Sequence, residues 1–195
     1  RKINSRFTES LIGVIRYYMK TSLNVTGFIF DKLCQFPDLI GLEVADEKFS
    51  YAQIINYSLQ TASVLKHLGA KKEAVGLIGQ RSASSYFGVL GIVFSGCHYV
   101  PINLKYNLDK QVKIIQDSGI RILVGSSEDL ASFSAALDEK SRESIEAWVI
   151  PHGQSNFTDE KWFSETSLDD ISILKEPESQ NVSHLSYIMY TSGST

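Results

Sequence analysis

The end of the chain holds the residues whose types and spacing are best suited to chemistry. Residues 185–190 are apolar and lead directly into Thr191, Ser192, Gly193, Ser194 and Thr195. Glycine lets consecutive backbone amides turn toward an anion, and serine and threonine hydroxyls add further hydrogen-bond donors. A strand that feeds such a loop is typical of a phosphate cradle. An ordinary turn rich in serine and glycine has the same composition, so the loop alone leaves both interpretations open.

The remaining candidates are single side chains. No G-x-x-x-x-G-K-[ST], G-x-G-x-x-G or G-x-S-x-G motif occurs. Cys34 and Cys97 lie far apart, so neither a zinc site nor a disulfide framework is indicated. Arg81 follows an apolar run and could meet a phosphate, but packing at a helix N-terminus or a carboxylate partner is the simpler interpretation. The histidines share no metal-ligand spacing and are interpreted as structural: His67, His98, His152 and His184.

Composition and charge exclude several classes of protein. The chain has 195 residues, of which 43% are hydrophobic and 21% charged, enough for one packed domain or two small ones. A net charge of −3 gives no electrostatic case for binding nucleic acid. The most apolar stretch, 86–102, is shorter than the roughly 20 residues that a membrane span needs. Two separated cysteines favour a reducing compartment, and we expect a cytoplasmic protein.

The first residues of the chain differ in character from the rest. Residues 1–23 are rich in arginine and lysine, with apolar residues at helical spacing, and are predicted to form a basic amphipathic helix. Such a helix either docks on its own domain or binds a membrane surface or a partner.

The elements that must position the terminal loop alternate between helix and strand. A short helix, a small hairpin and a longer helix ending at Gly69 are expected before residue 74. Beyond it, the pattern predicts strands at 74–78, 98–102, 120–125 and 147–150, and helices at 82–95, 108–118 and 127–143. Apolar strands separated by helices of this length predict an α/β fold with a mostly parallel sheet flanked by helices on both faces.

One stretch lacks such periodicity. Residues 152–183 carry seven acidic side chains against two lysines, which predicts a solvated connection, anchored by Trp162 and Phe163.

Longer strings resemble the motifs of one family, the adenylate-forming enzymes. Leu185-Ser-Tyr-Ile-Met-Tyr-Thr-Ser-Gly-Ser-Thr195 closely resembles their phosphate loop, which usually continues as G-x-P-K-G. Shorter matches stand in the order of the family: Phe49-Ser-Tyr-Ala-Gln-Ile54 resembles [T/S]-Y-x-E-L, Phe94-Ser-Gly-Cys-His-Tyr-Val-Pro-Ile-Asn103 resembles K-A-G-x-x-Y-V-P-[LI]-D, Gln80-Arg-Ser82 resembles E-R-S, and Gln116-Asp-Ser-Gly119 resembles [E/D]-D-S-G. The stretch 103–107 lacks the two prolines of the common D-P-x-Y-P, which weakens assignment to one subfamily.

The resemblance implies a fold, and it implies which functional residues lie within this chain and which lie beyond it. Such enzymes have a large N-terminal domain and a small mobile C-terminal one, so residues 24–195 would be an incomplete first part of the large domain, stopping inside the phosphate loop. The lysine of that loop, the acyl pocket, the Mg²⁺ and ribose ligands and the catalytic lysine would then lie beyond Thr195. No catalytic residue and no metal ligand is therefore expected in this chain, and the loop residues 191–195 are expected to contact the ATP phosphates.

The resemblance also implies a reaction. A small carboxylic or amino acid would attack ATP in the presence of Mg²⁺, releasing pyrophosphate, and the acyl-adenylate would pass its acyl group to a thiol of CoA or of a phosphopantetheinyl carrier protein. The motif strings resemble amino-acid-activating domains of nonribosomal peptide synthetases slightly more than fatty acyl-CoA or acyl-carrier synthetases. A noncatalytic nucleotide-binding or scaffold module of the same fold is the alternative. The chain by itself is expected to be inactive.

Overall fold

A parallel sheet forms the centre of the molecule. The computed structural model describes residues 25–79, 81–155, 157, 159–180 and 184–191. The sheet has five strands in the order β4-β3-β5-β6-β7, and every neighbouring pair is parallel. The strands are β3 (Ala74–Ile78), β4 (His98–Ile102), β5 (Ile122–Val124), β6 (Ala147–Val149) and β7 (Trp162–Phe163).

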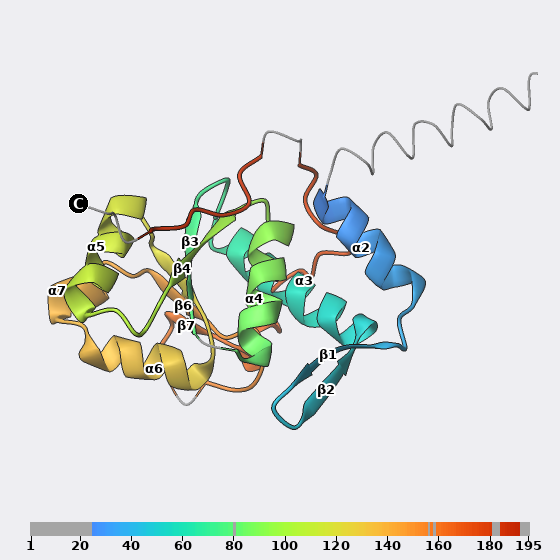
Figure 1. Ribbon diagram of the computed structural model, residues 1–195, viewed down its shortest axis with the longest axis horizontal. Coiled ribbons are helices and arrows are strands. Elements are labelled where there is room, and N and C mark those ends of the chain that lie inside the picture. Colours follow the sequence, from blue (N-terminus) through green and yellow to red (C-terminus); the bar gives the residue numbers. More distant parts are fainter. Residues whose placement is uncertain (1–24, 80, 156, 158, 181–183, 192–195) are drawn as a thin grey trace, which may run out of the picture.

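Helices cover both faces of this sheet, as its apolar strands require. Figure 1 shows α3 and α4 on one side and α5 and α6 on the other. The chain passes from β3 to β4 in one direction and from β4 across β3 to β5 in the other, so right-handed connections place α4 and α5 on opposite faces. The helices are α2 (Val25–Gln35), α3 (Tyr51–His67), α4 (Ala83–Phe94), α5 (Leu108–Ser118), α6 (Ser127–Ala136), α7 (Glu139–Glu143) and the short 3-10 helix η1 (Glu165–Ser167).

Successive residues of each strand pack into different cores. In β5, Leu123 joins the cluster that contains Ile114 of α5 and Phe133 of α6. Its neighbours Ile122 and Val124 join the cluster on the side of α3 and α4. This alternation follows from the pleat of the strand, and it fixes the register of the sheet because a one-residue slip would exchange the two faces.

A smaller layer precedes the sheet. The antiparallel hairpin β1 (Ile40–Val44) and β2 (Glu47–Ser50) leads straight into α3. Ser50 caps that helix through a reciprocal pair of hydrogen bonds with Gln53, and Gly69 adopts a left-handed conformation (φ 74°) just after its end. The predicted hairpin and the predicted helix end are therefore confirmed. The helix predicted at 1–23 lies outside the described residues.

Gly91 allows α3 and α4 to approach each other closely. A Cβ at this position would lie 2.5 Å from Cβ of Thr61 and 3.0 Å from the backbone oxygen of Ser58. We expect Gly91→Ala to lower the free energy of unfolding by about 1–3 kcal/mol, because helix backbones must separate to admit the methyl group. Denaturant unfolding measures this change. Ser132→Thr adds a methyl group at an exposed position of α6 and serves as the control; equal stability losses in both variants would contradict the close approach.

Three sequence-based boundaries were wrong. The single helix predicted at 127–143 is two helices, because Leu137 is buried with an extended backbone (ψ 143°) and Asp138 caps α7 by accepting a 2.8 Å hydrogen bond from the Ser141 amide. The strand predicted at 120–125 is shorter. Trp162 and Phe163 do more than anchor a connection, since they pair with β6 as the edge strand of the sheet.

Candidate functional site

The segment that carries the candidate phosphate loop runs along the free edge of β4. The Tyr99 amide donates a 3.1 Å hydrogen bond to the Ser186 oxygen, and the Ile188 amide donates a 3.0 Å bond to the Tyr99 oxygen. Together they form a parallel bridge between Tyr99 and Tyr187. The apolar run at 185–190 is thus extended and adjoins the sheet, but a single bridge holds it where a regular ladder was expected.

Side chains on both faces fix this segment. On the α5 side, Ile188 and Tyr190 pack against the core, and the Ser118 hydroxyl donates a 2.8 Å hydrogen bond to Tyr190 Oη. On the other side, the Tyr187 ring stacks on Tyr99 with 5.6 Å between ring centroids. Burial, and secondly the neighbouring Tyr187, raise the pKa of Tyr99, so its hydroxyl stays protonated at neutral pH.

Two contacts fix the residues just before the predicted loop. Tyr187 lies opposite Tyr99, and the Tyr190 hydroxyl reaches Ser118, the last residue of α5. Thr191 follows directly and is exposed. The other predicted contacts, Ser192, Gly193, Ser194 and Thr195, lie outside the described residues.

Other polar groups gather at the carboxyl ends of the neighbouring strands. Ser82 after β3 caps α4, and Ser126 after β5 caps α6. Gly79 has a φ of 136°, and a Cβ there would lie 2.9 Å from both Asp129 Oδ2 and Ser85 Oγ. Backbone and side chains are therefore already close-packed in front of β3.

Arg81, the rival phosphate ligand, lies at the end of β3 and is exposed. Among the described residues it has no carboxylate partner, contrary to one interpretation of the sequence, so ion pairing does not account for its position. It therefore remains the natural comparison for the loop hydroxyls in mutational tests.

Two of the histidines, His184 and His152, make polar contacts within the fold. His184 Nε2 lies 2.7 Å from the Gly96 oxygen. Burial, and secondly His184, lower the pKa of His98. Sequence analysis missed the surroundings of His152, whose Nδ1 lies 3.1 Å from Glu165 and whose Nε2 lies 3.3 Å from Glu47. No local spacing signals a partner that is 105 residues away in the chain.

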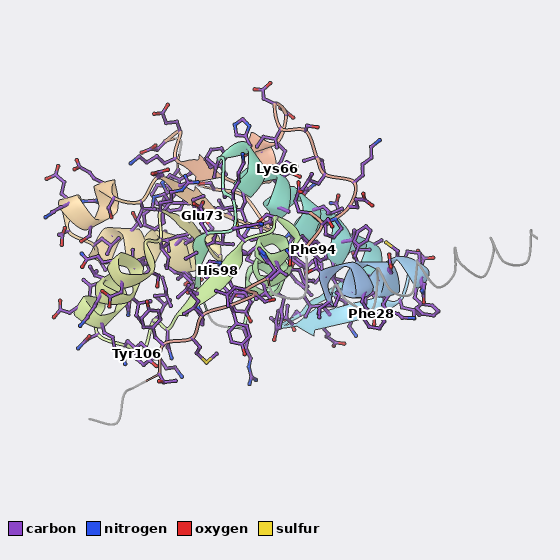
Figure 2. The ribbon with its side chains drawn as sticks, turned by 90° about the horizontal axis from the view of Figure 1, so that it is seen from above. Phe28, Lys66, Glu73, Phe94, His98 and Tyr106 are labelled. Carbon is purple, nitrogen blue, oxygen red and sulfur yellow. The ribbon has the colours of Figure 1, made fainter. Side chains whose placement is uncertain are left out.

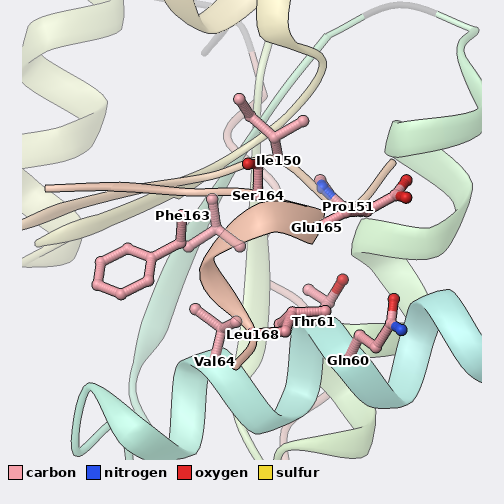
Figure 3. Close-up of a pocket in the computed structure, with 10 residues that line it drawn as sticks. Gln60, Thr61, Val64, Ile150, Pro151, Phe163, Ser164, Glu165 and Leu168 are labelled. Carbon is pink, nitrogen blue, oxygen red and sulfur yellow. The ribbon is translucent and has the colours of Figure 1, made fainter. Parts of the chain in front are cut away.

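A narrow cavity lies between α3 and η1 (Figure 3). Its volume of about 10 Å³ is close to that of one water molecule, too small for a substrate. Gln60 Oε1, which is buried without a hydrogen-bond partner, is among its lining residues. This cavity therefore suits a structural water.

Among the residues that the structure describes, no group of three His, Cys, Asp or Glu side chains is placed to hold a metal ion. No helix in the same part of the chain is both long and apolar enough to cross a membrane.

Comparison with known sequences points to one family. The model of a family described as AMP-binding enzyme matches residues 30–195. Gramicidin S synthase 2 of Brevibacillus brevis is 28% identical over 177 residues, which cover 88% of this chain and 3% of the synthase. Indigoidine synthase of Streptomyces lavendulae is 25% identical over 190 residues, 94% of this chain and 13% of that protein. The chain thus spans only a small part of the curated relatives it matches.

Solved structures share the fold. The anthranilate CoA ligase AuaEII in complex with anthranoyl-AMP superposes with a TM-score of 0.73 at 23% identity, over 88% of this chain and 33% of the ligase. The nonribosomal peptide synthetase FmoA3 in its alpha-methyl-L-serine-AMP bound form gives a TM-score of 0.69 at 15% identity, over 88% of this chain and 17% of the synthetase. The α/β architecture expected from the sequence is confirmed by these neighbours.

Proposed function

Because this chain belongs to the AMP-binding enzyme family, we propose that it supplies the first part of the large domain of an ATP-dependent enzyme that activates a carboxylate as an acyl-adenylate. Residues 24–195 are the portion assigned to that domain. The observation that carries the proposal is the parallel bridge between Tyr99 and Tyr187, which holds the segment before the loop residues against the free edge of β4.

The loop contributes electrostatic stabilisation. ATP, when bound, supplies the phosphorus that the carboxylate attacks and the pyrophosphate that leaves. Negative charge accumulates on the leaving group as the bond breaks, and donors fixed beforehand stabilise that charge without reorganising. Thr191, Ser192, Gly193, Ser194 and Thr195 provide hydroxyl and backbone donors of this kind. The stacked Tyr99 and Tyr187 hold the segment before the loop against β4.

The loop carries no charge of its own. Residues 191–195 include neither a lysine nor a carboxylate, so they fit the phosphate oxygens of ATP but offer no charged ligand to Mg²⁺. We therefore assign the balancing cations, Mg²⁺ and a lysine, to the ATP phosphates and to residues outside this chain. No catalytic residue is assigned within it.

We assign the substrate to the amino acids. A curated relative named nonribosomal peptide synthetase Ao415, of Arthrobotrys oligospora, is 26% identical over 161 residues, 81% of this chain, and this favours amino acids over fatty acids. The acceptor is a thiol, either of a phosphopantetheinyl carrier protein or of CoA. Cys34 and Cys97 are unpaired thiols, which agrees with a cytoplasmic location.

Exchange of labelled pyrophosphate into ATP tests this function. The intact protein that contains this chain is incubated with ATP, Mg²⁺ and single acids from a panel of amino acids and fatty acids. We expect exchange that depends on one or a few amino acids. Exchange supported only by fatty acids would contradict the substrate class, and a folded protein that is inert toward the whole panel would favour the noncatalytic module.

A further inference from the structure

A second concave site lies at the amino edge of the sheet, beside the start of β4. Its volume is about 450 Å³, within the range of small-molecule sites. The walls come from the end of α3, the loop before β3, the turn before β4, residues 178–180 and His184. Thr191, the one described residue of the loop proposed for ATP, does not line this cavity.

The walls of this cavity are strongly basic, although the whole protein is acidic. Lys66, Lys71 and Lys72 line it, and Glu178 is the one carboxylate among its lining residues. Lys66 forms an ion pair with Glu178. Lys71 and Lys72 are exposed and have no carboxylate partner in the described part of the chain. Two lysines that line the cavity are thus left without a compensating carboxylate among the described residues.

The nearest acidic residue in the sequence is not available to neutralise these lysines. Glu73, next to Lys72, accepts hydrogen bonds from Arg121 at 2.7 and 3.3 Å, and Arg121 also pairs with Glu146 at 2.5 Å. The backbone of Glu73 is also fixed, because its oxygen accepts a 3.1 Å hydrogen bond from the His98 amide (Figure 2). Because the Glu73 carboxylate is committed to Arg121, the local field at the lysines stays positive.

Glu178 indicates what kind of ligand the cavity accepts. Its carboxylate is an oxyanion of the chain itself, already bound to one of the three lysines. The side chains of Lys66 and Glu178 are 54% and 40% exposed, and ion pairs in such positions contribute little to stability. A more highly charged anion can therefore displace Glu178 and engage all three ammonium groups.

We propose that this cavity binds a small multivalent oxyanion of the di- or polyphosphate class. Lysine binds phosphate as a compact point charge, and adjacent uncompensated lysines require a ligand with two or more negative charges. The proposal rests on the cavity and its charges, independently of the activity assigned above.

Calorimetric titration of the intact protein with inorganic tripolyphosphate tests the proposal. We expect the Lys71→Gln/Lys72→Gln variant to bind about tenfold more weakly or worse, because two charge-assisted contacts are lost. Glu178→Gln is expected to bind more tightly, since Lys66 is freed, and affinity should fall as salt is raised. A gain of affinity is a result that a merely unfolded variant cannot give.

Two control variants distinguish binding in this cavity from a general effect of positive charge and from binding at the ATP loop. Lys113→Gln/Lys140→Gln removes the same charge from exposed positions of α5 and α7 and should leave binding unchanged. Thr191→Ala/Ser192→Ala alters only the ATP loop, so a binding event that this variant weakens belongs to that loop, and the event in the cavity is the one that Lys71→Gln/Lys72→Gln weakens. The proposal would be overturned if both lysine variants weakened binding equally, or if the loop variant lost binding altogether. It would also be overturned if citrate bound as tightly as tripolyphosphate at equal ionic strength.

Discussion

Replacing Thr191 and Ser192 together by alanine in the intact protein is expected to lower kcat by roughly 10²-fold or more at saturating ATP. Loss of one preorganised donor to developing negative charge typically costs on the order of 10²–10³ in rate. Thr191 is exposed and directly follows the segment that the Tyr99–Tyr187 bridge holds against β4, so its hydroxyl is accessible to a phosphate. Because the hydroxyls act mainly in the transition state, the KM for ATP should change much less than kcat.

Arg81→Ala provides the matched comparison. Arg81 lies after the end of β3 and is exposed, and its replacement should reduce kcat less than the paired loop change. Thermal melts on the same samples separate a loss of catalysis from a loss of folding. If the loop is only a turn, the double alanine variant keeps kcat within about threefold and loses only stability. A larger kcat defect in Arg81→Ala, at unchanged melting temperature, would move the phosphate contact to the end of β3.

The 195-residue chain by itself is expected to give no detectable ATP–pyrophosphate exchange, while the intact protein exchanges. The physical reason is the absence of charge in the loop: residues 191–195 offer donors but no cation, and a departing pyrophosphate needs both. The measurement is the exchange assay on equal concentrations of the two proteins, with circular dichroism to establish that the short chain is folded. Exchange by the short chain would show that it holds a complete site.

The strands nearest the site could be predicted well from sequence. The boundaries at 74–78 and 98–102 are confirmed because both are apolar runs between helices with clear N-caps, such as Ser82 and Asn107. A buried parallel strand is the simplest interpretation of an apolar run when turn residues and amphipathic helices flank it. Local signals and tertiary structure agree there, whereas the pairing of the 185–190 segment with the edge of β4 was not predicted.

Other features depend on contacts that local pattern does not encode. Trp162 and Phe163 form too short a strand to show an alternation, and they enter the sheet because Trp162 stacks on Trp148 with 5.2 Å between centroids. The break at Leu137 depends on where that side chain is buried. The lysine cavity joins residues 66–72 to Glu178, which no spacing connects.

The most direct test of the central claim is a crystal structure of the intact protein with a nonhydrolysable ATP analogue and Mg²⁺. The account predicts phosphate oxygens within hydrogen-bonding distance of Thr191 and Ser192, directly after the segment that the Tyr99–Tyr187 bridge holds against β4. Phosphates bound in front of β3, at Arg81 and Ser82, with the 191–195 loop turned away from them, would contradict it.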